Sequence, residues 1–124
     1  MENQTVGEVF ETEIKRRFIK DFLDFLILQL VQTQPTWGYN IIKETEAKYG
    51  VKLRHGALYP MLNTLEVRGL ITSTKLLKKG RIRKTYKITP DGKNLLQTYH
   101  DFLKEQIGNG PSTTRRVQNK REPE

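Results

Sequence analysis

The chain has 124 residues, of which 35% are hydrophobic and 9% aromatic, enough for one small domain with a modest core. Its formal net charge of +8 favours a polyanionic partner, with nucleic acid as the leading candidate. The absence of cysteine excludes disulfides and thiolate metal sites, and it agrees with a cytoplasmic location.

The start of the chain is acidic. Residues 1–12 contain acids but neither lysine nor arginine, so we expect an acidic tail there. This segment lacks the basic start and the apolar core of a secretory signal. The most apolar stretch, residues 22–31, is too short and too interrupted by Asp24 and Gln29 to span a bilayer. We therefore expect a soluble protein with no membrane partner.

A first helix is predicted over residues 13–32, ending before Pro35, because the residue ahead of a proline is pushed out of the helical region. From Phe22 to Val31 its apolar residues occupy nearly every direction around the axis. A helix that is apolar all round must be buried all round. One layer of neighbours in so small a domain would not cover it, so we expect a second chain as the cover. The alternative is a central core helix in a monomer.

Two further helices are predicted. A turn at residues 35–38 precedes a helix over residues 39–49, which Gly50 ends. The next helix is predicted over residues 55–68, where leucines and a methionine follow helical spacing. Pro60 lies about one turn into it and indicates a start slightly later than residue 55.

Residues 70–88 are predicted to form a hairpin with a loop around Gly80. Thr89 and Pro90 are typical of a helix start, with threonine as the N-cap and proline at the first helical position. The helix predicted over residues 90–107 carries a long apolar stripe, and residues 108–124 have the composition of a disordered basic tail.

Three helices, a basic hairpin and a helix are the order of a winged helix-turn-helix. The predicted fold class is mainly α with a small β-hairpin, and the predicted DNA-binding domain covers residues 13–89. Its helix over residues 55–68 would pack by the apolar side and leave the other side free to enter a DNA major groove. The candidate DNA-contacting residues on and before this helix are Arg54, His55, Gly56, Ala57, Tyr59, Pro60, Asn63 and Thr64, and those on the preceding helix are Tyr39 and Lys43.

Asn63 can offer both a donor and an acceptor to a base edge, and Thr64 and Tyr59 can reach phosphate or base. For each of these residues the alternative is a solvated polar side chain on an amphipathic helix, and for Tyr59 it is a partly buried ring. Their interpretation as a recognition surface depends on the surface around them.

The hairpin, called the wing below, has the strongest charge. Residues 43–93 contain 13 lysines and arginines against four acids. The candidate DNA contacts in the wing are Lys75, Lys78, Lys79, Arg81, Arg83 and Lys84. Such a run suits phosphate contact or minor-groove insertion. The alternative is an edge strand that lysines protect from aggregation, which explains some of these charges but not all of them together.

Catalysis has little support in the sequence. His55 and His100 are far apart, and no thiol, glycine-rich phosphate loop or paired nucleophile and base is present. We expect no enzyme activity, no catalytic residue, no metal and no cofactor.

Five motifs within residues 25–96 carry a family resemblance. They are Leu28-x-Leu30, Gly38-Tyr39-x-Ile41, Gly56-x-Leu58-Tyr59-Pro60-x-Leu62-x-x-Leu65-Glu66, Gly69-Leu70-Ile71 and Tyr86-x-Ile88-Thr89-x-x-Gly92. Together they resemble the PadR family of winged helix-turn-helix transcriptional regulators. The resemblance implies a homodimeric repressor that binds double-stranded DNA at a site with twofold character.

In that family the carboxy-terminal helix and the first helix build the dimer, which makes residues 90–107 a dimerisation helix. The interface residues expected here are Phe18, Phe22, Phe25, Leu95, Tyr99, Phe102, Leu103 and Ile107. Many relatives release DNA when a small molecule binds near the dimer interface, so a small-molecule effector is a further candidate partner. Two features depart from the family: a single helix follows the wing, as in its short members, and Arg54 replaces a small capping residue, which exchanges a cap for a phosphate contact.

Two alternatives to a sequence-specific regulator stay open. A winged helix can serve as a protein-interaction module, because a fold does not fix a function. A non-specific architectural DNA-binding protein would need the basic wing but not the polar surface around Asn63 and Thr64.

Overall fold

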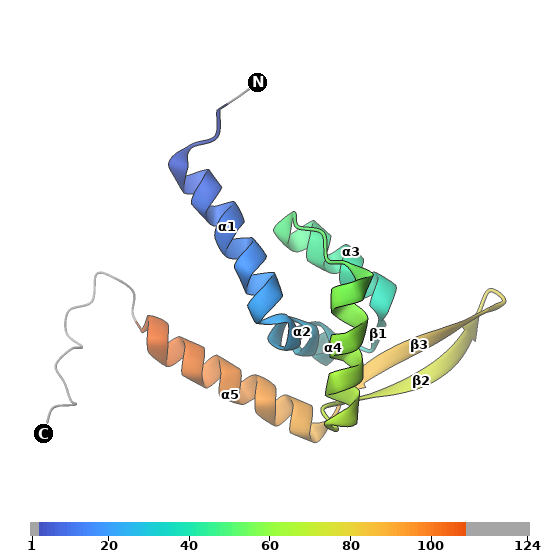
Figure 1. The fold of residues 1–124 in the computed structure, drawn as a ribbon. Helices are drawn as coiled ribbons and strands as arrows, with labels where there is room; N and C mark the ends of the chain where they lie inside the picture. The colour runs from blue at the N-terminus through green and yellow to red at the C-terminus, as the bar shows by residue number, and fades with distance from the viewer. Residues whose placement is uncertain (1–2, 109–124) are drawn as a thin grey trace, which may run out of the picture.

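The computed structural model describes residues 3–108 and confirms the predicted fold class, a mainly helical chain with a small antiparallel sheet. Its elements are α1 (Val6–Asp21), α2 (Leu23–Thr33), β1 (Thr36–Trp37), α3 (Gly38–Tyr49), α4 (His55–Val67), β2 (Ile71–Lys78), β3 (Arg81–Ile88) and α5 (Pro90–Ile107). Figure 1 shows an extended shape in which the β2–β3 wing points away at one end while α1 and α5 diverge at the other.

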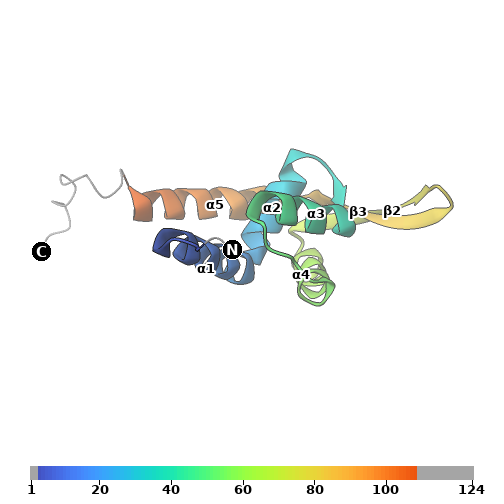
Figure 2. The ribbon, with the colours of Figure 1, turned by 90° about the horizontal axis from the view of Figure 1, so that it is seen from above.

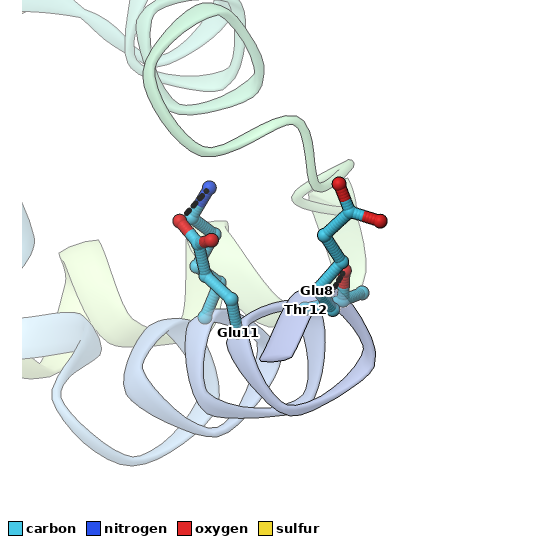
Figure 3. Close-up of polar contacts among 4 residues, drawn as sticks. Glu8, Glu11 and Thr12 are labelled. Atoms are coloured by element: carbon cyan, nitrogen blue, oxygen red, sulfur yellow. Dashed lines mark hydrogen bonds and ion pairs between the residues drawn. The ribbon is translucent and has the colours of Figure 1, made fainter. Parts of the chain in front are cut away.

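The first helix begins seven residues before the predicted position, so residues 6–12 are helical and the expected acidic tail is wrong there. A capping box starts the helix: the Thr5 hydroxyl accepts from the Glu8 amide at 3.0 Å, and the Glu8 carboxylate accepts from the Thr5 amide at 2.9 Å. Further polar contacts follow in the next turn (Figure 3). The Thr12 hydroxyl donates to the Glu8 carbonyl at 3.1 Å, and the Glu11 carboxylate lies 3.1 Å from the Lys15 ammonium.

The single helix predicted over residues 13–32 is also wrong, because the chain turns at Phe22, whose φ and ψ are −116° and 34°. Hydrogen bonding continues through the bend: the Phe22 amide donates to the Phe18 carbonyl at 2.9 Å, and the Phe22 carbonyl accepts from the Leu26 amide at 3.0 Å. The bend lets α2 enter the core while α1 points away from it (Figure 1).

The all-round burial of α2 is confirmed, but the cover is not a second chain. Leu23, Phe25, Leu26, Ile27, Leu28 and Val31 are buried within one chain, by contacts with α1, α4, α5 and β3. Helix α2 is therefore a central core helix that its own chain covers. No helix in residues 3–108 combines the length and apolar character that crossing a bilayer requires.

The sheet has the strand order β1-β3-β2, with all pairs antiparallel. The predicted hairpin is confirmed: Ile71 pairs with Ile88 at its base and Lys78 with Arg81 at its tip. A two-residue loop of Lys79 and Gly80, both with positive φ, closes it, as in a type I′ turn. The turn predicted at residues 35–38 additionally supplies β1, whose Trp37 pairs with Thr85.

The predicted start of the last helix is confirmed in its atomic detail. The Thr89 hydroxyl accepts from the Gly92 amide at 3.0 Å and donates to the Gly69 carbonyl at 2.7 Å, while the Thr89 amide donates to the Leu70 carbonyl at 3.1 Å. A side chain at position 92 would collide with the Leu70 carbonyl, so only glycine allows this approach. Gly108 closes α5, and the basic tail expected after it lies outside the described residues.

Candidate nucleic-acid interface

Helix α4 packs by one side and exposes the other. Leu58, Leu62 and Leu65 are at most 1% exposed, and all eight candidate DNA-contacting residues from Arg54 to Thr64 are exposed. The helix begins at His55, so the later start indicated by Pro60 is wrong. Pro60 lies on the exposed side, where water can satisfy the Gly56 carbonyl that loses its helical partner. Figure 2 shows α4 to one side of the row formed by α5, α3 and the wing.

Tyr59 connects α4 to the start of α3. Its ring lies so close to Gly38 that a Cβ there would collide with the phenol. The other neighbour of the ring is His55, stacked at a centroid distance of 5.6 Å and an interplanar angle of 13°. With 40% of its surface exposed, Tyr59 both positions α4 and presents an edge to solvent. Packing against the Tyr59 ring thus explains the glycine of the Gly38-Tyr39 motif.

A cation–aromatic cluster connects α3 and the wing. The Arg83 guanidinium carbon lies 3.3 Å from the centre of the Trp37 ring, which makes an edge contact with Tyr39 at 5.8 Å. The Lys43 ammonium lies 5.6 Å from the centre of the Tyr39 ring. Arg83 is thereby held against Trp37 and differs from the exposed cations of the wing. Sequence reasoning missed Trp37 here, because β1 and its pairing with β3 bring the two residues together.

A groove of about 410 Å³ separates α4 from the wing. Its lining residues are Trp37, Gly38, Tyr39, Tyr59, Asn63, Glu66, Ile82, Arg83, Lys84 and Tyr86. Glu66 is an acid in an otherwise basic surface: its carboxylate accepts from the Ser73 hydroxyl at 2.6 Å and lies 3.7 Å from the Lys84 ammonium. These contacts fix the base of the wing to α4.

Tyr86 lies beneath this groove and is 4% exposed. Burial, and then the negative charge of Glu66, raises the pKa of the Tyr86 phenol above its ordinary value. The phenol therefore stays uncharged beside the carboxylate, and Lys84 is the positive partner of Glu66.

The remaining wing cations, Lys75, Lys78, Lys79, Arg81 and Lys84, are exposed. Lys75 and Lys84 are direct partners across the strands, as are Lys78 and Arg81. Like charges opposite each other destabilise a hairpin, so this arrangement does not serve the fold. It makes the wing a concentrated positive surface.

The predicted dimer residues divide into two groups. Phe18, Phe22, Phe25 and Tyr99 pack together within one chain, with ring centroids 4.9 to 6.2 Å apart between neighbours. The Tyr99 hydroxyl donates to the Asp24 carboxylate at 2.9 Å, and burial followed by this hydrogen bond raises the Tyr99 pKa to about 12. Leu95 and Leu103 are half-buried, whereas Phe102 and Ile107 are 57% and 68% exposed.

The amino-terminal half of α1 has an exposed apolar stripe that the sequence analysis missed. It consists of Val6, Val9, Phe10 and Ile14, which are 48% to 70% exposed. Their spacing of three and four residues was a usable signal, but three of the four residues lie in the segment that we assigned to a tail.

A family model and several solved structures indicate one family. Residues 27–98 match the model of the Transcriptional regulator PadR-like family. The chain is 36% identical over 59 residues to Transcriptional regulator Rv3488 of Mycobacterium tuberculosis, and the match spans 48% of this chain and 55% of that protein.

Solved structures are similar over more of the chain. A PadR-like transcription factor from Bacteroides fragilis has a TM-score of 0.65 at 26% identity, over 76% of this chain and 91% of that one. A PadR family transcription regulator from Clostridium difficile has a TM-score of 0.62 at 27% identity, over 69% and 94%. The arrangement of α3, α4 and the wing agrees with these matches, and the chain belongs to the PadR-like family of transcriptional regulators.

Proposed function

We propose that the protein is a sequence-specific repressor that binds double-stranded DNA as a homodimer, with α4 in the major groove and the wing on the flanking backbone. The observation that supports it best is the shared groove: the exposed side of α4 and the basic wing form its two walls. A duplex that enters beside Asn63 therefore meets the cations of the wing.

The amino-terminal end of α4 suits a phosphate. Its first turn contains no acid, and the N-cap Arg54 makes no side-chain cap, so no capping side chain competes with an anion for the His55 and Gly56 amides. Arg54 and His55 are exposed beside this end, and Gly56 has open space around it. Asn63 and Thr64, about two turns further on, are left to read base edges.

The dimer would form through the two diverging helices. The exposed stripe of α1 and the exposed Phe102 and Ile107 of α5 lie on arms that point away from the DNA-binding elements (Figure 1). Exposed apolar stripes on two neighbouring arms are typical of a surface that another chain covers. Twofold symmetry then places two α4 helices about one helical turn of DNA apart, roughly 34 Å.

Repression would follow from occupation of promoter DNA. A small-molecule effector would act by binding one arrangement of the paired arms more tightly than another, since only unequal affinity shifts the equilibrium between them.

The experiment that tests this function is a selection of bound duplexes from a random pool, at low and at near-physiological salt. We expect an inverted repeat with half-sites about one helical turn apart. A double variant, Asn63→Ala with Thr64→Ala, should still bind DNA but recover a degraded motif. Tight binding without a motif, lost as salt rises, would indicate an architectural protein. No enrichment at either salt would favour a protein-interaction module.

A further inference from the structure

The wing exposes an aliphatic pair that its own fold does not use. Leu77 and Ile82 are 73% and 71% exposed, and they are direct partners across β2 and β3. Direct partners point to the same face of a ribbon and touch each other. Exposed aliphatic side chains near the tip of a two-stranded ribbon add nothing to the core and favour aggregation.

This pair lies on the face of the ribbon that looks toward α4. Nearer the base, the same face presents Ser73 and Lys84, which both contact Glu66 of α4. Side chains alternate between the two faces of a strand, and Leu77 and Ile82 follow these positions by even steps. The aliphatic pair therefore continues the α4-facing surface toward the tip.

The groove confirms this orientation for one member of the pair. Ile82 lines it together with Tyr59 and Asn63, which belong to the exposed side of α4. A duplex held by α4 would extend from these residues along the groove toward the wing.

Cations surround the pair on both sides. Lys75 and Lys84 are the next pair toward the base on the same face, Lys79 lies in the turn at the tip, and Lys78 and Arg81 lie at the tip on the opposite face. The whole hairpin segment, residues 70–88, contains no acid. An apolar centre with a positive rim matches the DNA minor groove, whose edges are phosphates and whose interior is formed by sugars and base edges.

We propose that Leu77 and Ile82 enter the minor groove beside the site held by α4 and act as an apolar wedge that opens a base-pair step and bends the duplex. The proposal rests on the proposed DNA-binding function. Wedging side chains kink DNA toward the major groove, and flexible pyrimidine–purine steps yield at the lowest cost. The wing would thus add a preference for deformable sequence beside the half-site.

The test is the double variant Leu77→Thr with Ile82→Thr in the full chain, because threonine keeps the strand preference and removes most of the apolar surface. With the duplex recovered by selection, affinity is measured by anisotropy and bending by energy transfer between dyes at the two ends. We expect affinity to fall roughly tenfold to a hundredfold, the bend to decrease, and the salt dependence to stay unchanged. Unchanged urea unfolding shows that the variant is folded.

Leu76→Thr is the matched control. Leu76 is 46% exposed on the opposite face of the same strand, so its replacement should leave the bend and the affinity as they are.

Four outcomes would overturn the wedge. If the double variant bends and binds DNA normally while Lys79→Ala weakens binding, the wing contacts only the backbone, and the proposed function stands. If the unsubstituted chain enriches no duplex, both proposals fall. If the double variant keeps its DNA affinity but loses binding to phosphatidylserine vesicles, the tip is a membrane contact. If sedimentation shows that it changes oligomeric state, the pair is a contact between copies.

Discussion

Lys79 occupies a position that its backbone disfavours. Its φ of 50° lies in the left-handed region, where Asn, Asp or Gly is preferred at the first position of a type I′ turn. A lysine there is a cost to the hairpin, and its charge at the tip of the wing is the compensating gain if the wing contacts phosphate.

We expect Lys79→Asn to separate these two effects. It should raise the free energy of unfolding by up to about 1 kcal/mol, because asparagine tolerates positive φ. It should also weaken DNA binding and reduce the slope of log affinity against log salt by about 1. Urea unfolding and anisotropy titrations at several salt concentrations measure both quantities. The control is Lys93→Gln, an exposed position on α5, which should leave the slope unchanged. An unchanged slope for Lys79→Asn would remove Lys79 from the interface.

Gly38 is constrained by a contact rather than by its backbone. We expect Gly38→Ala to lower the free energy of unfolding by about 1–3 kcal/mol, since its methyl group would collide with the Tyr59 ring. Tyr59→Ala in the same chain removes the collision, so the two effects should be strongly non-additive in a double-mutant cycle of urea unfolding. Additive effects would show that the ring does not constrain position 38.

Between elements, Asp24 at the start of α2 and Tyr99 of α5 make a contact that the sequence does not reveal. The Asp24 carboxylate accepts from the Phe25 amide at 2.7 Å and from the Tyr99 hydroxyl at 2.9 Å. It therefore connects the start of α2, next to the bend at Phe22, to the middle of α5.

Tyr99 makes this junction sensitive to alkali. Its pKa rises from 10.0 to about 12 on folding, so the unfolded chain loses the phenol proton first as pH increases. The stability that this group contributes is complete below pH 10 and is lost as pH rises toward 12. We expect Tyr99→Phe to lower the unfolding free energy at pH 7 by about 1 kcal/mol and to reduce its decline between pH 10 and about 12. Urea unfolding across that range is the measurement, and an identical alkaline decline in both proteins would contradict it.

How far the sequence predicts these elements depends on whether the signal is local. Thr89 and Pro90 specify the start of α5 from neighbouring residues, and the hydrophobic spacing of α4 required no partner. The bend at Phe22 was missed because the residues on both sides favour a helix, and the contacts that accompany the bend, such as Phe22 with Tyr99 of α5, join segments that are distant in the sequence. The start of α1 was missed for another reason. Its Thr5–Glu8 capping box is a local signal for a helix start, but the acidic composition of residues 1–12 led to the prediction of a tail.

In the candidate site, too, local signals were predictable and contacts between distant segments were not. Helical spacing alone identified the exposed side of α4, and charge identified the wing. The stacking of Arg83 on Trp37 and the pairing of Lys84 with Glu66 depend on strand pairing across distant segments, which residue patterns do not contain.

For the whole molecule, the exposed stripe of α1 gives the sharpest test of the dimer. We expect Phe10→Glu to yield a folded monomer in sedimentation, because a charge would be buried in the paired arms. Affinity for an inverted repeat should fall steeply, while weak binding to a single half-site should persist. Gln97→Glu adds a negative charge at an exposed position of α5 outside its apolar stripe and should leave the dimer intact. A dimeric Phe10→Glu protein would exclude α1 from the interface.

The bonds of Thr89 to Gly69, Leu70 and Gly92 make the end of α4, the base of the wing and α5 move as one body. The 18 residues of α5 form an arm about 27 Å long. Through such a lever, a swing of about 10° moves the far end by about 5 Å, more than the 3.4 Å between successive base pairs. In the proposed dimer, a small change in the angle between the two copies would therefore shift one α4 relative to the other by more than a base-pair step. One α4 would then be out of register with its half-site.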